Sequence, residues 1–246
     1  NRRIKPVSFS VLIPARYDSV RLPGKPLVDL SGKTIVRRVY EAATKSDANL
    51  VCVATDSEAI LKECDSFGAK CVLTNKSHKT GSDRLAQATS ILGLDNEHVV
   101  VNLQGDEPFV NFRDINTVAT ILDDVNVDMG TLYADLDAKD ESNPNVVKVW
   151  SEEGGKVISF SRNELKIADS QLLKSHHIGI YAYRVGFLNK FIDWPQTDNE
   201  KVESLEQLRA LDRGKIIHVK KSISEIHLGI DTIEDLNLAK KILLDA

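Results

Sequence analysis

The sequence predicts an α/β protein with a doubly wound, mostly parallel, Rossmann-like sheet and a smaller antiparallel insertion. The first half of its 246 residues alternates short apolar runs with segments of helical spacing, which is the rhythm of a parallel sheet with crossover helices. These apolar runs are continuous, as expected for strands that helices cover on both faces. In the second half, short strand-like runs follow one another across polar gaps, which indicates the insertion.

The predicted elements of the first half follow in order. Strands are expected at 9–13, 50–54, 70–73 and 98–103, where β-branched and other apolar residues cluster. A helix is expected at 34–44, because its apolar residues recur on one side. Two further helices are expected to begin at the caps Ser57 and Ser82 and to end at Gly68 and Gly93, residue types typical of helix termini.

The second half adds the insertion and then a return to the main sheet. Its strand-like runs cover 129–134, 146–150, 157–160 and 178–183. A helix is expected at 202–211, ending at Gly214, followed by a strand at 215–219 and a final helix capped by Thr232. We therefore expect one domain over 1–246, in which the insertion, 128–214, separates the first half, 8–127, from the returning segment, 215–246.

Composition restricts the partners and the compartment. The net charge of −4 argues against nucleic acid, or an anionic membrane, held by overall charge. No stretch approaches the roughly 20 apolar residues of a membrane helix. The basic start at 1–5 precedes a short apolar run that we interpret as a strand rather than a signal peptide. The three cysteines include no C-x-x-C pair, and we expect buried thiols in a reducing, cytoplasmic compartment.

A basic loop follows the first predicted strand, at the edge where open parallel sheets bind ligands. Residues 15–27 contain Arg16, Arg21 and Lys25, with Gly24 allowing close backbone approach. Three cations on one loop suit a triphosphate, because each arginine can bind two phosphate oxygens at once and a lysine acts as a compact point charge. The loop has neither the Walker A pattern nor the G-x-G-x-x-G pattern. From the charges alone, a solvated basic turn is the alternative.

Carboxylates at two distant points of the sequence fit a divalent cation beside such a phosphate site. Asp106 and Glu107 directly follow the fourth predicted strand, and Asp231 precedes the cap of the last helix. Mg²⁺ prefers a few carboxylate oxygens together with phosphate oxygens and water. A turn residue at Asp106 and a capping residue at Asp231 are the alternatives that the pattern leaves open.

These motifs together resemble a known family. The loop P-A-R-x-x-S-x-R-L-P-G-K-P-L is similar to that of sugar nucleotidyltransferases, and in particular of cytidylyltransferases that activate acidic sugars. The most similar family is that of the 3-deoxy-manno-octulosonate cytidylyltransferases. The resemblance continues in order along nearly the whole chain, through A-T-D at 54–56, V-N-L-Q-G-D-E-P at 101–108, N-P-N-V-V-K-V at 143–149, F-S-R at 160–162, H-I-G-I-Y-A-Y-R at 177–184, L-E-Q-L-R at 205–209 and G-I-D-T at 229–232.

The resemblance implies a nucleotidyltransferase that binds CTP and an acidic eight-carbon sugar. The sugar's anomeric hydroxyl would attack the α-phosphorus of CTP and release pyrophosphate, for lipopolysaccharide biosynthesis. The resemblance also implies Mg²⁺ as the cofactor, with Asp106 and Asp231 as its ligands. The implied catalytic residues are Arg16, Lys25, Asp106 and Asp231. The implied CTP-binding residues are Ala15, Arg16, Arg21, Lys25, Thr80, Ser82 and Asp106.

The second substrate is expected to bind toward the insertion, which is also the expected surface of a homodimer. Thr80 and Ser82 open a helix after the third strand and are assigned to the cytosine or ribose edge. Adjacent histidines on a strand point to opposite faces, so His176 and His177 are not expected to share a metal. The residues that the resemblance assigns to the sugar acid are Arg84, Gln104, Arg162, His177, Tyr181, Glu206 and Gln207.

The chain departs from the family pattern at two places, of which the first borders the expected sugar site. After F-S-R the chain continues with Asn163 to Ile167 and a short segment, where the family has a Ser-Pro-Ile-Pro-like stretch and a longer loop. Before Gly229, where the family often has a proline, the chain has Ile226 to Leu228. An 8-amino octulosonate or a sialic-acid-like sugar is therefore an alternative acceptor. A non-catalytic CTP-binding protein that kept the fold is the alternative of another class.

Overall fold

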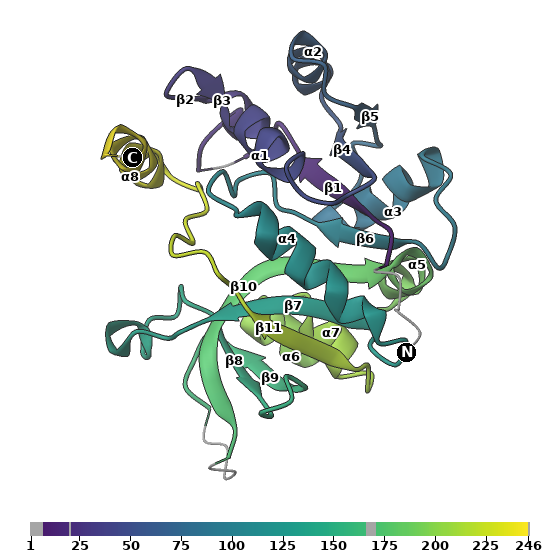
Figure 1. Ribbon diagram of the computed structural model, residues 1–246, viewed down its shortest axis with the longest axis vertical. Helices are drawn as coiled ribbons and strands as arrows, with labels where there is room; N and C mark the ends of the chain where they lie inside the picture. The colour runs from purple at the N-terminus through teal and green to yellow at the C-terminus, as the bar shows by residue number, and fades with distance from the viewer. Residues whose placement is uncertain (1–6, 20, 166–170, 246) are drawn as a thin grey trace.

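A computed structural model describes residues 7–19, 21–165 and 171–245. Over these residues nine strands form one mixed sheet in the order β11-β7-β10-β6-β1-β4-β5, with β8 paired to β10 and β9 paired to β8 (Figure 1). The strands of this sheet are β1 (Phe9–Ala15), β4 (Leu50–Thr55), β5 (Cys71–Leu73), β6 (Val99–Asn102), β7 (Met129–Ala134), β8 (Lys148–Ser151), β9 (Val157–Ser161), β10 (Leu173–Arg184) and β11 (Ile217–Lys221). A separate hairpin consists of β2 (Asp29–Leu30) and β3 (Lys33–Thr34).

Helices connect these strands. The α-helices of the described residues are α1 (Ile35–Ala43), α2 (Glu58–Ser66), α3 (Gly81–Ile91), α4 (Phe112–Ala119), α5 (Val185–Asp193), α6 (Asp198–Glu203), α7 (Leu208–Leu211) and α8 (Ile233–Asp245). Short 3₁₀ helices are η1 (Lys25–Leu27), η2 (Thr120–Asp123) and η3 (Ala138–Asp140). None of the helices in this part of the chain combines the length and apolar character that crossing a membrane requires.

The strand order creates a crevice at one end of the sheet. β1 pairs in parallel with β4, which pairs in parallel with β5, so the chain first moves outward on one side of β1. β6 then returns to pair in parallel with the other side of β1. The loops after β1 and β6 therefore diverge at a topological switch point, where open α/β sheets bind their ligands.

The predicted fold class is confirmed, and the structure shows how the antiparallel part joins the main sheet. β7 and β10 are not a separate sheet, because β10 pairs antiparallel with both β6 and β7. β11 lies beside β7 in parallel register. Only β8 and β9 extend away: β8 pairs antiparallel with the first half of β10, and β9 pairs antiparallel with β8. The long strand β10 thus carries residues of the insertion directly to the crevice.

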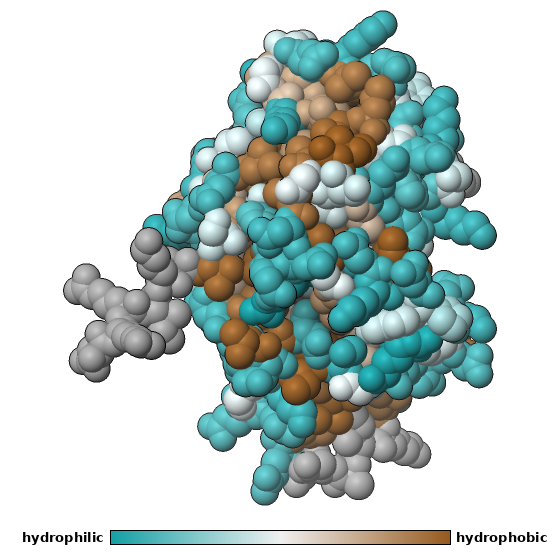
Figure 2. Space-filling model, turned by 90° about the vertical axis from the view of Figure 1, so that its right-hand side faces the viewer, coloured by the Kyte–Doolittle hydropathy of each residue, from teal (hydrophilic) through white to brown (hydrophobic). Residues whose placement is uncertain are grey.

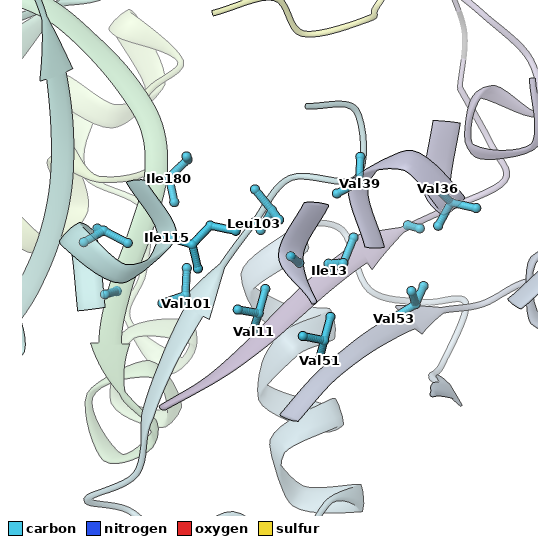
Figure 3. Packing of buried hydrophobic residues seen from close by; sticks show 14 of the residues in the cluster. Val11, Ile13, Val36, Val39, Val51, Val53, Val101, Leu103, Ile115 and Ile180 are labelled. Carbon is cyan, nitrogen blue, oxygen red and sulfur yellow. The ribbon is translucent and has the colours of Figure 1, made fainter. Parts of the chain in front are cut away.

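Side chains from alternate strand positions form two cores, one on each face of the sheet. Val11 of β1, Val53 of β4 and Val101 of β6 point toward α1 and α4, where Val39 and Ile115 meet them (Figure 3). Each fully buried side chain of this size contributes about 1.5–3 kcal/mol to the stability of the fold. The two clusters therefore form a rigid base beneath the crevice. The opposite face packs against α3 and α5 and includes Leu12, Cys52, Val100, Leu85 and Leu188.

Two of the predicted helix starts, at Ser57 and Thr232, are confirmed, and one, at Ser82, is wrong. The Ser57 hydroxyl accepts from Ile60 N at the start of α2, and the Thr232 hydroxyl accepts from Asp235 N at the start of α8. α3, however, begins at Gly81 with Thr80 as its cap, not Ser82. Thr80 takes this place because its hydroxyl and the Asp83 carboxylate form a reciprocal capping box.

The helix predicted at 202–211 is wrong as a single element. Ser204 adopts a left-handed conformation with φ 53°, so the segment divides into α6 and α7. A second error is an omission, because α4 and α5 were not predicted. The basic start at 1–5 and the Lys166–Ile167 part of the departing segment lie outside the described residues.

The surface beside α3 and α5 mixes residue types. Figure 2 shows this side of the molecule, where hydrophobic residues lie among hydrophilic ones. Ile91, at the end of α3, is one of the exposed apolar residues. All three cysteines are free thiols, with Cys52 and Cys64 buried and Cys71 half-buried.

Candidate active site

A cleft with a volume of about 720 Å³ occupies the switch point between β1 and β6. Four segments that are distant in sequence meet there: the loop after β1, the loop after β6, the start of α3 and the residues before α8. The predicted residues that line this cleft are Ala15, Arg16, Arg21, Lys25, Thr80, Arg84, Gln104, Asp106 and Asp231.

The basic loop is a compact turn rather than an extended arm. Gly24 has φ 64°, a left-handed conformation that favours glycine, and its N–H donates to the Tyr17 carbonyl at 3.2 Å. The next N–H, of Lys25, donates to the Leu22 carbonyl at 3.1 Å. Through this turn all three cations of the loop line one cleft, which disfavours the alternative of a merely solvated basic turn.

Lys25 joins the two predicted metal carboxylates. Its Nζ lies 2.6 Å from Asp106 Oδ2 and 2.9 Å from Asp231 Oδ1. Arg21 Nη2 lies 3.0 Å from the other oxygen of Asp231. A backbone hydrogen bond from Ile230 N to the Asp106 carbonyl, 2.9 Å long, holds the two carboxylate segments side by side. Two aspartates separated by 125 positions (231 − 106) therefore converge on one point.

This cluster of charges shifts the ionisation of its members. Burial alone would lower the pKa of Lys25, but Asp106 and Asp231 outweigh it and raise that pKa. Burial opposes ionisation of Asp231 as well, yet Lys25 and Arg21 lower the pKa of this carboxyl. Glu107 shows the reverse balance, because burial, reinforced by Asp106 and Asp231, raises its pKa to about 7. Asp231 thus stays ionised and ready for a cation.

The donor set fits Mg²⁺ coordinated jointly by protein and substrate. Asp106 and Asp231 already place carboxylate oxygens within 3 Å of a single cationic nitrogen. Within the described residues no group of three or more His, Cys, Asp or Glu side chains forms a complete metal site. Mg²⁺ is commonly held by one or two carboxylates plus phosphate oxygens and water, so this incomplete set suits a metal that enters with a nucleotide.

Gly105 explains why the loop after β6 can approach β1 so closely. A Cβ at this position would lie 2.8 Å from the Pro14 carbonyl oxygen, a distance that real side chains avoid. The backbone of the loop therefore packs directly on the end of β1. This contact places Asp106, the next residue, beside Lys25.

The residues assigned to the base or ribose line two different spaces. Thr80 lines the main cleft, although its hydroxyl already accepts from Asp83 N at 3.1 Å. The Ser82 hydroxyl donates to Glu206 Oε2 at 2.8 Å and lines a second, smaller chamber. The Thr80 and Ser82 side chains both interact with the Glu206 carboxylate, so the two residues flank the boundary between the main cleft and the smaller chamber.

Arg84 lines the main cleft but is bound to the protein. Its guanidinium donates to Asp56 Oδ2 and to Thr74 Oγ1, each at 2.6 Å, and its side chain is 3% exposed. Asp56, the last residue of the A-T-D motif at 54–56, therefore orients this arginine. Arg84 has five N–H donors and keeps some for a ligand.

The other predicted sugar residues separate into two groups. Gln104, Tyr181, Glu206 and Gln207 line the smaller chamber, about 100 Å³ in volume. His177 lies behind it, with its ring 5.7 Å from that of Tyr181. Its Nε2 lies 3.0 Å from the Thr131 hydroxyl, and burial lowers the pKa of His177 to about 3. His177 is thus a neutral support of Tyr181.

Arg162 is not among the residues that line either cavity. Its Nε donates to the Glu203 carbonyl at 2.8 Å and its Nη1 to the Pro144 carbonyl at 3.2 Å. Its own carbonyl accepts from Lys148 Nζ at 2.9 Å. In this structure Arg162 joins the end of β9 to the end of α6, away from the residues that line the cleft.

Sequence reasoning missed some residues of the site. Tyr183 and Asn102 line the small chamber, and Ser19 and His78 line the main cleft. Tyr183 had a detectable signal, since it lies two positions after Tyr181 on one strand and so faces the same side of the sheet. Ser19 and Asn102 lie inside the loop motif and the V-N-L-Q-G-D-E-P motif, which assign no role to either residue.

The fold and the site define a class of protein. A mixed α/β sheet whose switch-point crevice sets a three-cation loop against two aspartates is suited to transfer a nucleotidyl group from a nucleoside triphosphate. The sequence also matches the model of the Cytidylyltransferase family over residues 10–222. The chain belongs to this family and, within it, to the 3-deoxy-manno-octulosonate cytidylyltransferases.

The individual similarities extend over nearly the whole chain. A 3-deoxy-manno-octulosonate cytidylyltransferase of Photobacterium profundum is 44% identical, covering 96% of this chain and 100% of the relative. One from Vibrio vulnificus is 42% identical, with 96% and 98% covered. A solved structure of CMP:2-keto-3-deoxy-manno-octonic acid synthetase complexed with CTP has a TM-score of 0.88 at 33% identity, covering 97% of this chain and 99% of that one. A cytidylyltransferase from Leptospira borgpetersenii, 17% identical with a TM-score of 0.66 and covering 98% and 88%, shares the fold.

Proposed function

We propose that this chain is an enzyme that transfers CMP from CTP to the anomeric hydroxyl of 3-deoxy-manno-octulosonate, with release of pyrophosphate. The observation that carries this proposal is the convergence of Lys25, Asp106 and Asp231 at the switch point. The relatives and the solved structure that extend over the whole chain support the same reaction. Its place in lipopolysaccharide biosynthesis is part of this proposal.

The basic loop would bind the triphosphate. Arg16 and Arg21 are exposed on the wall of the cleft, where their guanidinium groups can each reach two phosphate oxygens. Lys25 has three N–H donors, of which two are engaged by Asp106 and Asp231. The third can donate to a phosphate oxygen. Together these cations would offset the charge that develops on the departing pyrophosphate.

Asp106 and Asp231 would hold Mg²⁺ together with phosphate oxygens and water. When bound, the metal would neutralise triphosphate charge and lower the pKa of the attacking hydroxyl. Within the protein, Lys25 balances the charge of the two carboxylates. The residues proposed for the sugar acid are Arg84, Gln104, Tyr181, Glu206 and Gln207 near the cavities, with His177 behind Tyr181 and Arg162 farther away.

A homodimer and a cytoplasmic location complete the proposal. Ile158 of β9 and Leu173 at the start of β10 are exposed apolar residues on the part of the sheet that extends outward. Such residues, on the antiparallel extension, support a second copy of the chain as partner. Light scattering coupled to size exclusion would measure the mass in solution, and a monomer at micromolar concentration would contradict the dimer.

A coupled pyrophosphate assay tests the reaction directly. We expect release of pyrophosphate only when CTP, Mg²⁺ and the sugar acid are all present. CTP binding without turnover, measured by calorimetry, would favour the non-catalytic CTP-binding alternative. A panel containing 3-deoxy-manno-octulosonate, its 8-amino analogue and a sialic acid would show which acceptor has the highest kcat/KM.

A further inference from the structure

Asp231 reaches the cleft on a segment without regular structure. Residues 222–232 belong to no helix or strand and connect β11 to α8 (Figure 1). Beyond this segment α8 is anchored, because it contacts β2 and buries Leu236 and Ala239 in the core that contains Leu30. Fixing the backbone of a residue outside helices and strands has an entropic cost that local contacts must offset. For Asp231, the side chain of Asp235 supplies these contacts.

One oxygen of Asp235 binds both peptide groups that flank the Cα of Asp231. Asp235 Oδ2 accepts from Asp231 N at 3.0 Å and from Thr232 N at 2.9 Å. Rotation about φ of Asp231 turns the first N–H relative to the Cα, and rotation about ψ turns the second. Because a residue has only these two soft backbone dihedrals, two N–H groups directed at a single oxygen constrain the backbone conformation of Asp231.

Helix capping explains only one of these two bonds. In a capping box the third helical residue accepts from the N–H of the cap, here Thr232, whose hydroxyl accepts in return from Asp235 N at 3.2 Å. The capping boxes at the starts of α3 and α6 have carboxylates that accept from the cap N–H at 3.1 and 3.3 Å. In neither of these two described segments does the carboxylate also accept from the backbone N–H before the cap. The bond from Asp231 N is therefore additional to the cap.

Backbone contacts place Asp231 more firmly than its contact with the phosphate loop does. The ion pair between Arg21 and Asp231 is 3.0 Å long, but it joins side chains that are 65% and 44% exposed, respectively. Ion pairs with this exposure are weak. In contrast, the Ile230 N–H donates to the Asp106 carbonyl at 2.9 Å, and the next two N–H groups donate to Asp235. Three consecutive N–H groups thus hold the backbone around Asp231.

We infer that Asp235 is a positioning residue, which holds the Asp231 carboxylate in the conformation that binds Mg²⁺ together with Asp106. This inference rests on the proposed function, in which Asp231 is a metal ligand. Asp235 itself is half-buried and is not among the residues that line the cleft. Without Asp235, metal binding would have to order the backbone of Asp231, and the entropic cost of this ordering would weaken the binding of Mg²⁺ with CTP.

Asp235→Ala removes both hydrogen bonds to the backbone around Asp231. The measurement is calorimetry of CTP binding without sugar acid, over a series of Mg²⁺ concentrations, and its result is the Mg²⁺ concentration that gives half of the maximal CTP affinity. We expect this Mg²⁺ requirement to rise about 5- to 30-fold, the factor that corresponds to ordering one residue on binding. The Tm should fall by about 2–4 °C, as for a lost helix cap. Asp235→Asn keeps an oxygen that can accept both bonds and should retain the wild-type Mg²⁺ requirement.

Two control variants separate positioning from helix stability and from charge. Thr232→Ala removes the other half of the capping box, so it should lower the Tm by a similar amount at an unchanged Mg²⁺ requirement. Glu234→Ala removes an exposed carboxylate from the same first turn of α8 and should also leave the Mg²⁺ requirement unchanged. Amide hydrogen exchange measured by NMR gives a second readout, since the Asp231 amide should exchange slowly in the wild type and faster in Asp235→Ala.

Several results would overturn the inference. They are an unchanged Mg²⁺ requirement in Asp235→Ala, an equal rise in Thr232→Ala or Glu234→Ala, a rise in Asp235→Asn as large as in Asp235→Ala, and fast exchange of the Asp231 amide in the wild type. Asp231→Asn, measured in parallel, is the reference for the metal role. An unchanged Mg²⁺ requirement in Asp231→Asn would refute the metal assignment of the proposed function, whereas a rise in Asp231→Asn without one in Asp235→Ala would refute the positioning role alone.

Discussion

Asp231→Asn separates a catalytic role of the carboxylate from a structural one. The substitution keeps the size and the polar character of the side chain but removes its charge. In the structure Asp231 contacts Lys25 at 2.9 Å and Arg21 at 3.0 Å, while its side chain is 44% exposed and that of Arg21 is 65% exposed. Ion pairs with this exposure contribute at most about 1 kcal/mol each. We therefore expect the free energy of unfolding to fall by about 1 kcal/mol, or about 2–4 °C in Tm.

The expected effect of Asp231→Asn on activity is much larger. A preorganised charge that acts on the transition state contributes about 2.7–4 kcal/mol, which corresponds to a loss of roughly 100- to 1,000-fold in kcat. The assay is pyrophosphate release at saturating CTP and sugar acid over a titration of Mg²⁺. Because the amide is a poorer ligand for a hard cation, the Mg²⁺ concentration for half-maximal rate should also increase.

The control for Asp231→Asn is Asp135→Asn. Asp135 forms an exposed ion pair with Lys221 at 2.7 Å, outside the cleft, so the same chemical change should leave kcat and Mg²⁺ dependence unaltered. Full kcat with unchanged Mg²⁺ dependence in Asp231→Asn would refute the assignment of Asp231 as a metal ligand. A large fall in Tm together with lost activity would mean that Asp231 acts mainly in folding.

Three further predictions follow from other parts of the structure. Arg16→Ala should raise the KM for CTP about 10- to 100-fold at unchanged Tm, since the exposed side chain has its expected partner only in the nucleotide; an unchanged KM would remove Arg16 from the phosphate site. Gly105→Ala should lower the free energy of unfolding by about 1–3 kcal/mol, because its Cβ would meet the Pro14 carbonyl at 2.8 Å; equal denaturant midpoints would contradict this. Burial lowers the pKa of His177 from 6.5 to about 3, so the unfolded state binds more protons between these values and stability should fall with pH below 6.5, by about 2 kcal/mol at pH 5. In His177→Gln the free energy of unfolding, measured by urea titration at each pH, should fall less steeply as the pH decreases. An unchanged pH dependence would mean that His177 is not neutral in the folded protein.

The strands of the nucleotide half could be predicted because local sequence and tertiary packing agree there. Continuous apolar runs such as 50–54 are buried on both faces, and the serine cap of α2 acts within four residues of sequence. The errors arise where distant partners decide. Thr80, not Ser82, caps α3, because the Ser82 hydroxyl instead donates to Glu206, which lies 124 residues away in the sequence. Ser204 interrupts a helical pattern with a left-handed conformation that periodicity does not report.

The phosphate and metal part of the site was more predictable than the sugar part, for a physical reason. Ends of parallel strands must meet at one edge, so Lys25 and Asp106 could be placed together from the strand order alone. Arg162 and Arg84 depend instead on which of several nearby carboxyl or carbonyl groups attracts each guanidinium. In the structure Arg162 donates to the Glu203 carbonyl and Arg84 donates to the Asp56 carboxylate. No spacing rule in the sequence distinguishes these partners from a ligand.

The charge balance among the four side chains of the phosphate loop and its two carboxylates also bears on how the proposed substrates would bind. Lys25 Nζ lies at the point at which Asp106 and Asp231 converge, and Arg21 contacts Asp231 as well. Against the effect of burial, the two carboxylates raise the pKa of Lys25, so the Mg²⁺ proposed for them would compete with a stably charged ammonium. The phosphate oxygens of CTP would be alternative acceptors for the N–H donors of Lys25 and Arg21. We therefore expect Mg²⁺ to bind these carboxylates more tightly in the presence of CTP than alone.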